Sequence, residues 1–485
     1  MTRPCIGWIC AAMLTALSGC AVDQDREVAI YRQVIRERFP ATAPVRFEGA
    51  VTLLDALSTA NAHSEVLALD GETYLQALIE KERAFWFFFP TLSLAPTYSF
   101  QTGVSESSTP GAPKNERFDA PLTGAANLFN GFRDLATLRR AGWSAEQQRH
   151  LLADAQDSLL LNVAQAYYRV LRAERSVVVL ENSLAVQDER LRDAEARVKA
   201  EVGKPLDVAQ SRAQAAATRV RLIQARSDVV TGRELLSFLI GRPVRRLTLS
   251  DRFAVPRELA PLAALQAGAE ENRSDLRAAH AGVQAAQQNV ANAVGRYYPS
   301  LSVNLSYFLS RDTTPTDVEW VGLFSANLPI FSAGQIEAAV RTAWSGFRQA
   351  RLAQSLLRRQ VDQEVALAYE AFRASGEQLV ALRVQKDAAD EAVKQAQDSQ
   401  KVGLATNLDV LAALDAQQIA ALGLVNEEYG YKVFYLSLVR TTGQLPTAWS
   451  TVATSQPASS PTTTRAAGGD TRPPIAGQPT TSSAP

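Results

Sequence analysis

The stretch ERAFWFFFPTLSLAPTYSF, Glu82–Phe100, changes its periodicity at a single residue, Pro90. Five aromatic residues, Phe85–Phe89, stand immediately before that proline, at the end of a helical sequence. After it, small and mostly polar residues alternate with apolar ones, which is the period of a β-strand. Because proline disfavours helix at the residue before it, Pro90 is predicted to convert a helix into a strand. We expect Pro96 to introduce a bulge or an early twist into that strand.

The same transition occurs a second time, in GRYYPSLSVNLSYFLS, Gly295–Ser310. Further matched residues are each 202 positions apart: Phe129 and Phe331, Val163 and Val365, and Asp207 and Asp409. Agreement at one separation over most of each half indicates an internal duplication. A length of 485 residues alone suggests roughly three domains, but the duplication favours one domain of two repeats.

Each repeat contains a second alternating segment, Phe118–Phe129 in the first and Val318–Phe331 in the second. The connections are polar and turn-forming, so each repeat is predicted to form one β-hairpin, at about residues 90–130 and 299–331. Such strands are typical of transmembrane barrels, although a soluble two-faced sheet alternates in the same way. Four strands cannot close a barrel, and an open edge is unstable in lipid. A membrane location therefore requires several subunits to share their strands.

A long helix is predicted after each hairpin. Residues 134–202 contain no proline, and apolar residues recur there every seven positions: Val163, Val170, Val177, Leu184, Leu191 and Val198. A similar coiled-coil seam runs over about residues 335–402. Each long helix is expected to stop at a glycine, Gly203 or Gly403. Return helices are then predicted from Asp207 to Ile240 and from Asp409 to Thr441.

Both ends of the chain differ in composition from the repeats. Residues 1–19 are predicted to be a lipoprotein signal peptide, because Arg3 precedes a short apolar run, Ile6–Leu17. The following LSGC resembles the bacterial lipobox, in which the cysteine, here Cys20, is lipidated; the alternative is an ordinary signal peptide. Residues 20–46 would be an N-terminal anchor segment. The Ser-, Thr- and Pro-rich residues 447–485 are predicted to be a disordered tail.

Composition and motifs argue against several classes of function. Lys+Arg and Asp+Glu balance at 50 each, so no basic surface for nucleic acid is indicated. His63, His150 and His280 lack metal-ligand spacing, and no catalytic or phosphate-binding motif occurs. The chain is therefore predicted not to be an enzyme and to bind no cofactor or metal. No unbroken run of about 18 apolar residues follows the N-terminus, so no internal membrane helix is expected.

Over about Phe47–Pro446 the chain resembles the TolC-type family of outer-membrane efflux proteins. The passages that carry this resemblance are Glu270–Val303, Leu328–Val340 and Lys401–Gln417. It implies a mainly α fold with a membrane β-barrel. Four strands from each subunit of a homotrimer would form a twelve-stranded barrel, and the duplicated helical hairpins would form a periplasmic α-barrel. Repeat 1 would span residues 47–241 and repeat 2 residues 262–446, with a linker at 242–261.

The resemblance also implies a function and partners. The chain would be a passive exit duct in the outer membrane of a Gram-negative bacterium, lipid-anchored and extending into the periplasm. A periplasmic adaptor would couple it to an inner-membrane transporter for efflux or secretion. A type I protein-secretion duct is an alternative within this fold. A lipid-anchored coiled-coil envelope protein is an alternative outside it, and four barrel-length segments argue against that one.

Particular positions inherit roles from the family. The tips that contact the adaptor would be Val202, Gly203 and Lys204, and Val402, Gly403 and Leu404. Lys204 departs from the small or apolar residue that is usual there. Asp207 and Asp409 are candidates for a periplasmic gate, or else N-caps of the return helices. Aromatic residues at the membrane interface would be Trp86, Phe87, Phe88, Phe89, Tyr297 and Tyr298.

Overall fold

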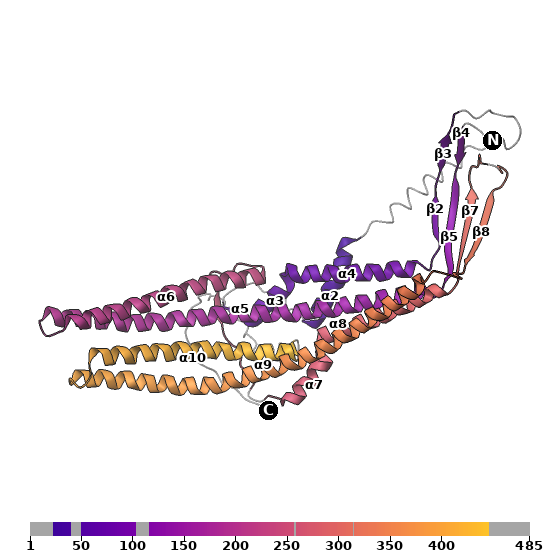
Figure 1. Cartoon of the computed structure of the whole chain (residues 1–485). Helices are drawn as coiled ribbons and strands as arrows, with labels where there is room; N and C mark the ends of the chain where they lie inside the picture. The colour runs from indigo at the N-terminus through magenta and orange to yellow at the C-terminus, as the bar shows by residue number, and fades with distance from the viewer. Residues whose placement is uncertain (1–22, 40–49, 103–115, 257–258, 314, 446–485) are drawn as a thin grey trace, which may run out of the picture.

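The computed structural model describes residues 23–39, 50–102, 116–256, 259–313 and 315–445. The described chain is elongated and mainly helical, with its long strands gathered at one end (Figure 1). The predicted signal peptide, Cys20 and the C-terminal tail lie outside the described residues.

Two helices of 67 residues each form the frame of the molecule: α5 (Arg133–Lys199) and α9 (Gln335–Lys401). Their first residues are 202 apart, as are their last residues, so the duplication extends to the ends of the helices. Each is followed by an antiparallel return helix, α6 (Pro205–Ile240) or α10 (Asn407–Thr441). At 1.5 Å per residue, each long helix measures about 100 Å. Residues of the predicted seams are buried, among them Val163, Val170, Leu180, Val361, Val365 and Phe372.

The chain forms a layer four elements wide along its length (Figure 1). Towards the tips the order is α6, α5, α10, α9, and nearer the sheet it is α4, α5, α8, α9, with contacts between each neighbouring pair. The remaining helices are α2 (Gln24–Arg38), α3 (Leu53–His63), α4 (Glu65–Trp86), α7 (Leu262–Asn272), α8 (Ser274–Val294) and the short η2 (Gly295–Tyr297).

A four-stranded antiparallel sheet of order β2-β5-β7-β8 extends this layer. Its strands are β2 (Thr91–Leu94), β5 (Pro121–Asn130), β7 (Ser300–Phe308) and β8 (Trp320–Asn327). The central pair, β5 and β7, joins the two repeats. Within the described sheet, the outer edges of β2 and β8 have no partner strand.

Pro96 interrupts its strand rather than bulging it. The chain leaves β2 after Leu94 and pairs again as β3 (Thr97–Phe100) with β4 (Glu116–Asp119), in a separate small sheet. Proline has no backbone N–H to donate, so the ladder stops there. The bulge lies instead in β5, between Asn127 and Phe129. The predicted distortion is therefore found at Pro96, but it is a break in the strand and not a bulge.

The sheet has one apolar face and one mainly polar face. Directly paired residues lie on the same face, and one row of pairs is Leu94, Leu122, Tyr307 and Trp320. The neighbouring row contains Ser93, Thr123 and Ser306, and the last two hydroxyls lie 3.2 Å apart. The alternation read from the sequence is thus present as two chemically different surfaces.

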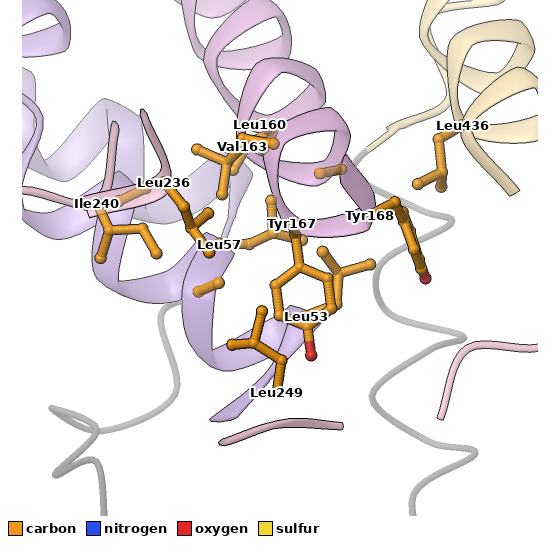
Figure 2. Close-up of a cluster of buried hydrophobic side chains, with 14 of the residues drawn as sticks. Leu53, Leu57, Leu160, Val163, Tyr167, Tyr168, Leu236, Ile240, Leu249 and Leu436 are labelled. Carbon is orange, nitrogen blue, oxygen red and sulfur yellow. The ribbon is translucent and has the colours of Figure 1, made fainter. Parts of the chain in front are cut away.

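The main core lies where α3, α5 and α6 meet, around Leu57, Val163 and Tyr167 (Figure 2). The Tyr167 hydroxyl lies 2.8 Å from the carbonyl oxygens of Val51 and Ser250, in the paired strands β1 (Ala50–Thr52) and β6 (Thr248–Ser250). The segment expected to be a linker, 242–261, therefore supplies a strand to this core.

One described helix, α10, is long and apolar enough to cross a membrane by length and composition alone. A search for unbroken apolar runs does not single out α10, whose apolar residues are interrupted by a few charges. A single such helix is weak evidence for a membrane span. Along its length α10 packs on α9 and α5, and Val410, Leu414 and Leu436 are buried. Its apolar character fits a position between two helices.

Two arginines connect helices midway along the molecule. Arg38 of α2 pairs with Asp157 of α5 and donates to Ser274 Oγ at 2.7 Å. Arg273, only 4% exposed, pairs with Glu364 of α9 at 2.6 Å. Burial raises the pKa of Asp157 to about 6, against the opposing effect of Arg38. Removing one partner of a buried ion pair leaves an uncompensated charge in the interior, which is strongly destabilising. These contacts therefore fix the relative positions of their helices.

The Asp157 carboxyl predicts a pH dependence of stability. Its pKa is higher in the folded chain than in the unfolded one, so its favourable contribution is complete below about pH 3.8 and is lost as the pH rises through about 6. Between pH 7.5 and pH 5 the folded protein should therefore gain roughly 1 kcal/mol relative to Asp157→Asn, in denaturant titrations of both proteins. Parallel pH profiles for the two proteins would contradict this assignment.

Candidate functional site at the helical tips

The two helical hairpins end in short turns at the opposite end of the molecule from the sheet (Figure 1). Val202 is 78% exposed in the first turn, and Val402 and Leu404 are 70% and 85% exposed in the second. Apolar side chains this exposed gain nothing from the fold of one chain, and such patches often mark interaction sites. The predicted tip residues therefore lie at the two ends of the described helices that are farthest from the sheet.

Gly203 does not end the first long helix, contrary to the sequence expectation. The left-handed residue there is Glu201 (φ 62°), and Val202 N donates to the Arg197 carbonyl oxygen at 3.0 Å. Gly203 has another role: a Cβ at that position would lie 2.8 Å from the Val198 backbone nitrogen. The glycine is required by close approach of the turn to α5.

The second tip follows the predicted pattern. Gly403 has φ +79°, and the next N–H, from Leu404, donates to the Ser399 carbonyl oxygen at 2.9 Å. This is the usual glycine-terminated helix end, in which glycine adopts the left-handed conformation without strain. The two tips are therefore built differently, with a non-glycine left-handed residue only in the first.

Neither Asp207 nor Asp409 is an N-cap, because both return helices begin two residues before them. Thr406 caps α10, and Asp409, three residues on, accepts from the Thr406 backbone N–H at 2.7 Å in a capping box. Hydrogen bonds from the Thr406 side chain and backbone lower the pKa of Asp409. Asp207 occupies the same third position of α6 after Lys204, which makes no side-chain cap. Both carboxylates lie in first turns, where the helix dipole favours negative charge.

A cavity of about 360 Å³ separates the hairpins just behind the tips. Gly203, Lys204 and Asp207 line it from the first hairpin, and Lys401 and Asn407 line it from the second. The cavity thus adjoins both predicted tips.

Hydrogen bonds connect the hairpins across this region. Arg190 donates to Gln400 Oε1 at 3.1 Å, and Asn407 approaches Ser211 Oγ at 3.4 Å. Farther from the tips, Asp415 accepts from Arg221 at 3.0 Å and from Gln214 at 3.1 Å. No local signal in the sequence indicates these contacts. The packing of α10 against both helices of the first hairpin, α5 and α6, brings these residues together.

The predicted interface aromatics lie at the other end, where helices meet strands. Trp86 ends α4, and its ring lies 5.1 Å from that of Phe89. Tyr298 lies 6.2 Å from Phe132, a residue that sequence reasoning did not include. Trp86, Phe87, Phe88, Phe89, Tyr297 and Tyr298 are each about half exposed. These rings therefore gather at one level of the molecule.

Side chains that could bind a metal ion are not grouped together among the described residues. These residues include no group of three or more His, Cys, Asp or Glu side chains placed to hold a metal ion. His150 lies 3.2 Å from Glu146, and burial lowers its pKa. That pair is a local contact on α5, without a nucleophile or ligand set around it.

Comparisons with known proteins agree with this geometry. The family model described as "Outer membrane efflux protein" matches residues 75–242 and 266–444, one segment in each repeat. The outer membrane efflux protein BepC of Brucella suis is 25% identical, over 72% of this chain and 77% of its own length. The proteases secretion protein PrtF of Dickeya chrysanthemi is 24% identical, over 65% and 74%. The solved CmeC outer membrane channel of Campylobacter jejuni matches with a TM-score of 0.74 at 16% identity, over 81% of this chain and 86% of that chain.

The capping box at the second tip can be tested by removing either of its two side chains. Thr406→Ala and Asp409→Ala each remove one half of the box, so each should increase amide hydrogen exchange over Asn407–Leu411 to a similar extent. The matched control is Asp207→Ala, whose helix has no box to lose. Unchanged exchange in Asp409→Ala would show that the carboxylate does not cap the helix.

Proposed function

The chain belongs to the outer membrane efflux protein family, and on that premise we propose that three copies of it close into one passive exit duct. Proteins of this family are outer-membrane channels of Gram-negative bacteria rather than enzymes, and the chain is accordingly an outer-membrane protein. The trimer, the closed barrel and the coupling to other proteins are the parts that we propose.

The observation that carries the proposal is the four-stranded sheet with open edges at β2 and β8. Unpaired backbone N–H and C=O groups in hydrocarbon cost several kcal/mol each, so an open sheet cannot remain in a bilayer. Pairing β8 of one copy with β2 of the next satisfies both edges, and three copies would give twelve strands. A barrel of that size has room for an aqueous lumen.

The two faces of the sheet support the same arrangement. The row Leu94, Leu122, Tyr307 and Trp320 would face lipid, and the side that carries Thr123 and Ser306 would face the lumen. Transmembrane barrels place apolar residues outward and polar ones inward in this way. The half-exposed aromatic residues at the junction with the helices would then lie at the periplasmic membrane interface, with Trp86 and Tyr298 among them.

The helices continue the same edges towards the periplasm. α4 and α6 follow the β2 edge, and α9 follows the β8 edge (Figure 1). Closing the sheet would therefore also bring α9 of one copy beside α4 and α6 of the next, forming a helical barrel. The tips Val202–Lys204 and Val402–Leu404 would end this barrel and dock on a periplasmic adaptor that leads to an inner-membrane transporter.

Three further roles belong to this proposal. Lipidation of Cys20 would add an anchor in the outer membrane. Asp207 and Asp409 would stand near the periplasmic mouth, where three copies of each would favour cations. Because Asp409 is already held by Thr406, a gate there would use a carboxylate that is fixed in place.

Protein secretion is the second candidate, since PrtF is named for the secretion of proteases. It requires the same duct and differs only in cargo. A lipid-anchored coiled-coil stalk is less well supported, because it provides no reason for four strands with an apolar face.

Membrane extraction separates the duct from the stalk. The duct should resist carbonate and urea washing of membranes, and should migrate as a heat-sensitive trimer on gels. Cys20→Ala should leave the protein in the membrane fraction, since the barrel and not the lipid would hold it there. Release of Cys20→Ala into the soluble periplasm would contradict the duct and favour the stalk.

A further inference from the structure

A regular series of ion pairs runs along the first hairpin. Four arginines of α6, spaced seven residues apart, each pair with an acidic residue of α5, and those acids are also spaced by seven in the opposite direction. The pairs are Arg212–Glu195 (2.9 Å), Arg219–Asp188 (3.3 Å), Arg226–Glu181 (2.7 Å) and Arg233–Glu174 (2.5 Å). We call this series the arginine ladder.

Because of its spacing of seven residues, the ladder can fix the register of α6 on α5. In a coiled coil, positions seven residues apart return to the same side of the helix, so all four pairs lie along one side of the α5–α6 contact. A shift of α6 on α5 by one to six residues would break every pair at once. The ladder therefore specifies the antiparallel register more sharply than the small residues of this seam, such as Ala215 and Ala225, can do.

The ladder is stronger at its inner end. Arg233 is 17% exposed and also donates to the carbonyl oxygens of Val244 (2.9 Å) and Leu247 (2.9 Å). Arg219 and Arg212, nearer the tip, are 59% and 67% exposed. Exposed pairs are weak singly and are screened by salt. The pair Arg233–Glu174 thus fixes the register most strongly, and the weaker pairs of Arg219 and Arg212 extend the same register towards the tip.

The second hairpin has no counterpart to this ladder. Among the described residues, no ion pair joins α9 to α10. Their contacts include the stacked rings of Phe372 and Tyr431, 4.7 Å apart, and the hydrogen bond from Gln417 to Asp390, 2.9 Å. The ladder is therefore a property of the first repeat alone, and so is the strained turn at Glu201.

We infer that the arginine ladder positions the first tip. By holding the outer third of α6 in register on α5, it keeps Lys204, Asp207 and Ser211 level with the second tip, where Asn407 contacts Ser211. The ladder residues act as positioning residues, because each of them pairs with a residue of its own hairpin. The inference rests on the proposed function only for the docking role of the tips. The relative position of the two tips along the helix axes matters to a partner that contacts both of them.

A cysteine pair within one chain reports this alignment. Ser211→Cys and Asn407→Cys replace two side chains in contact, and the only native cysteines, Cys5, Cys10 and Cys20, lie outside the hairpins. The rate of disulfide formation would be measured in the full chain in membranes. Adding Arg219→Glu should slow it about fivefold, because the introduced carboxylate would repel Asp188.

Three matched variants show whether charge pairing is the cause. Arg219→Lys should keep the original rate, and the exchange Arg219→Glu with Asp188→Arg should restore it. Arg383→Glu, which reverses an exposed arginine of α9 outside the ladder, should have no effect.

Two results would overturn the inference: an unchanged rate in Arg219→Glu, or failure of the exchanged pair to restore the rate in a protein that still inserts in membranes. Because the disulfide forms within one chain, neither result depends on the trimer or on an adaptor. A ladder confirmed in a protein that fails the extraction test would leave this inference standing without the duct.

Discussion

The unsatisfied edges of a four-stranded sheet are the constraint on which the rest of the structure depends. β2 and β8 each present a row of backbone donors and acceptors that a lipid bilayer cannot hydrogen-bond. The fold extends the same two edges into α4, α6 and α9, so the proposed edge-to-edge contact between copies would satisfy the sheet and the helices together. In the proposed trimer the single chain would be one third of a cylinder, and contacts between copies would cover part of its exposed apolar surface.

Much of this architecture could be predicted from the sequence because it repeats. The duplication placed matching elements in the two halves of the chain, and the helices α5 and α9 keep the separation of 202 residues at both of their ends. Alternation after Pro90 and heptads from Val163 onward are strong signals, since each extends over many residues. The resemblance to a known family supplied the role of the tips, which periodicity alone does not give.

Local chemistry at the turns was harder to predict. Glycine was expected to end both long helices, yet Glu201 takes the left-handed position in the first, and Gly203 is needed for close packing instead. One of the two roles considered for the aspartates was the N-cap, but Thr406 precedes Asp409 as the cap, and a sequence of this kind, T-x-x-D, offered a usable signal. The arginines of the ladder also recur every seven residues in the sequence, but a period of seven in charged residues does not by itself show which acidic residues they pair with. Contacts between the hairpins, such as Asp415 with Arg221, depend on tertiary arrangement and had no local signal.

Disulfide cross-linking between the two sheet edges tests the central claim most directly. Ser93→Cys on β2 would be combined in turn with single cysteines along β8, among them Ser325→Cys, which lies on the same polar face. If copies close edge to edge, at least one combination should give cross-linked dimers and trimers on a denaturing gel and nothing larger. Monomer in every combination, or a series of bands extending beyond the trimer, would contradict a closed barrel of three copies.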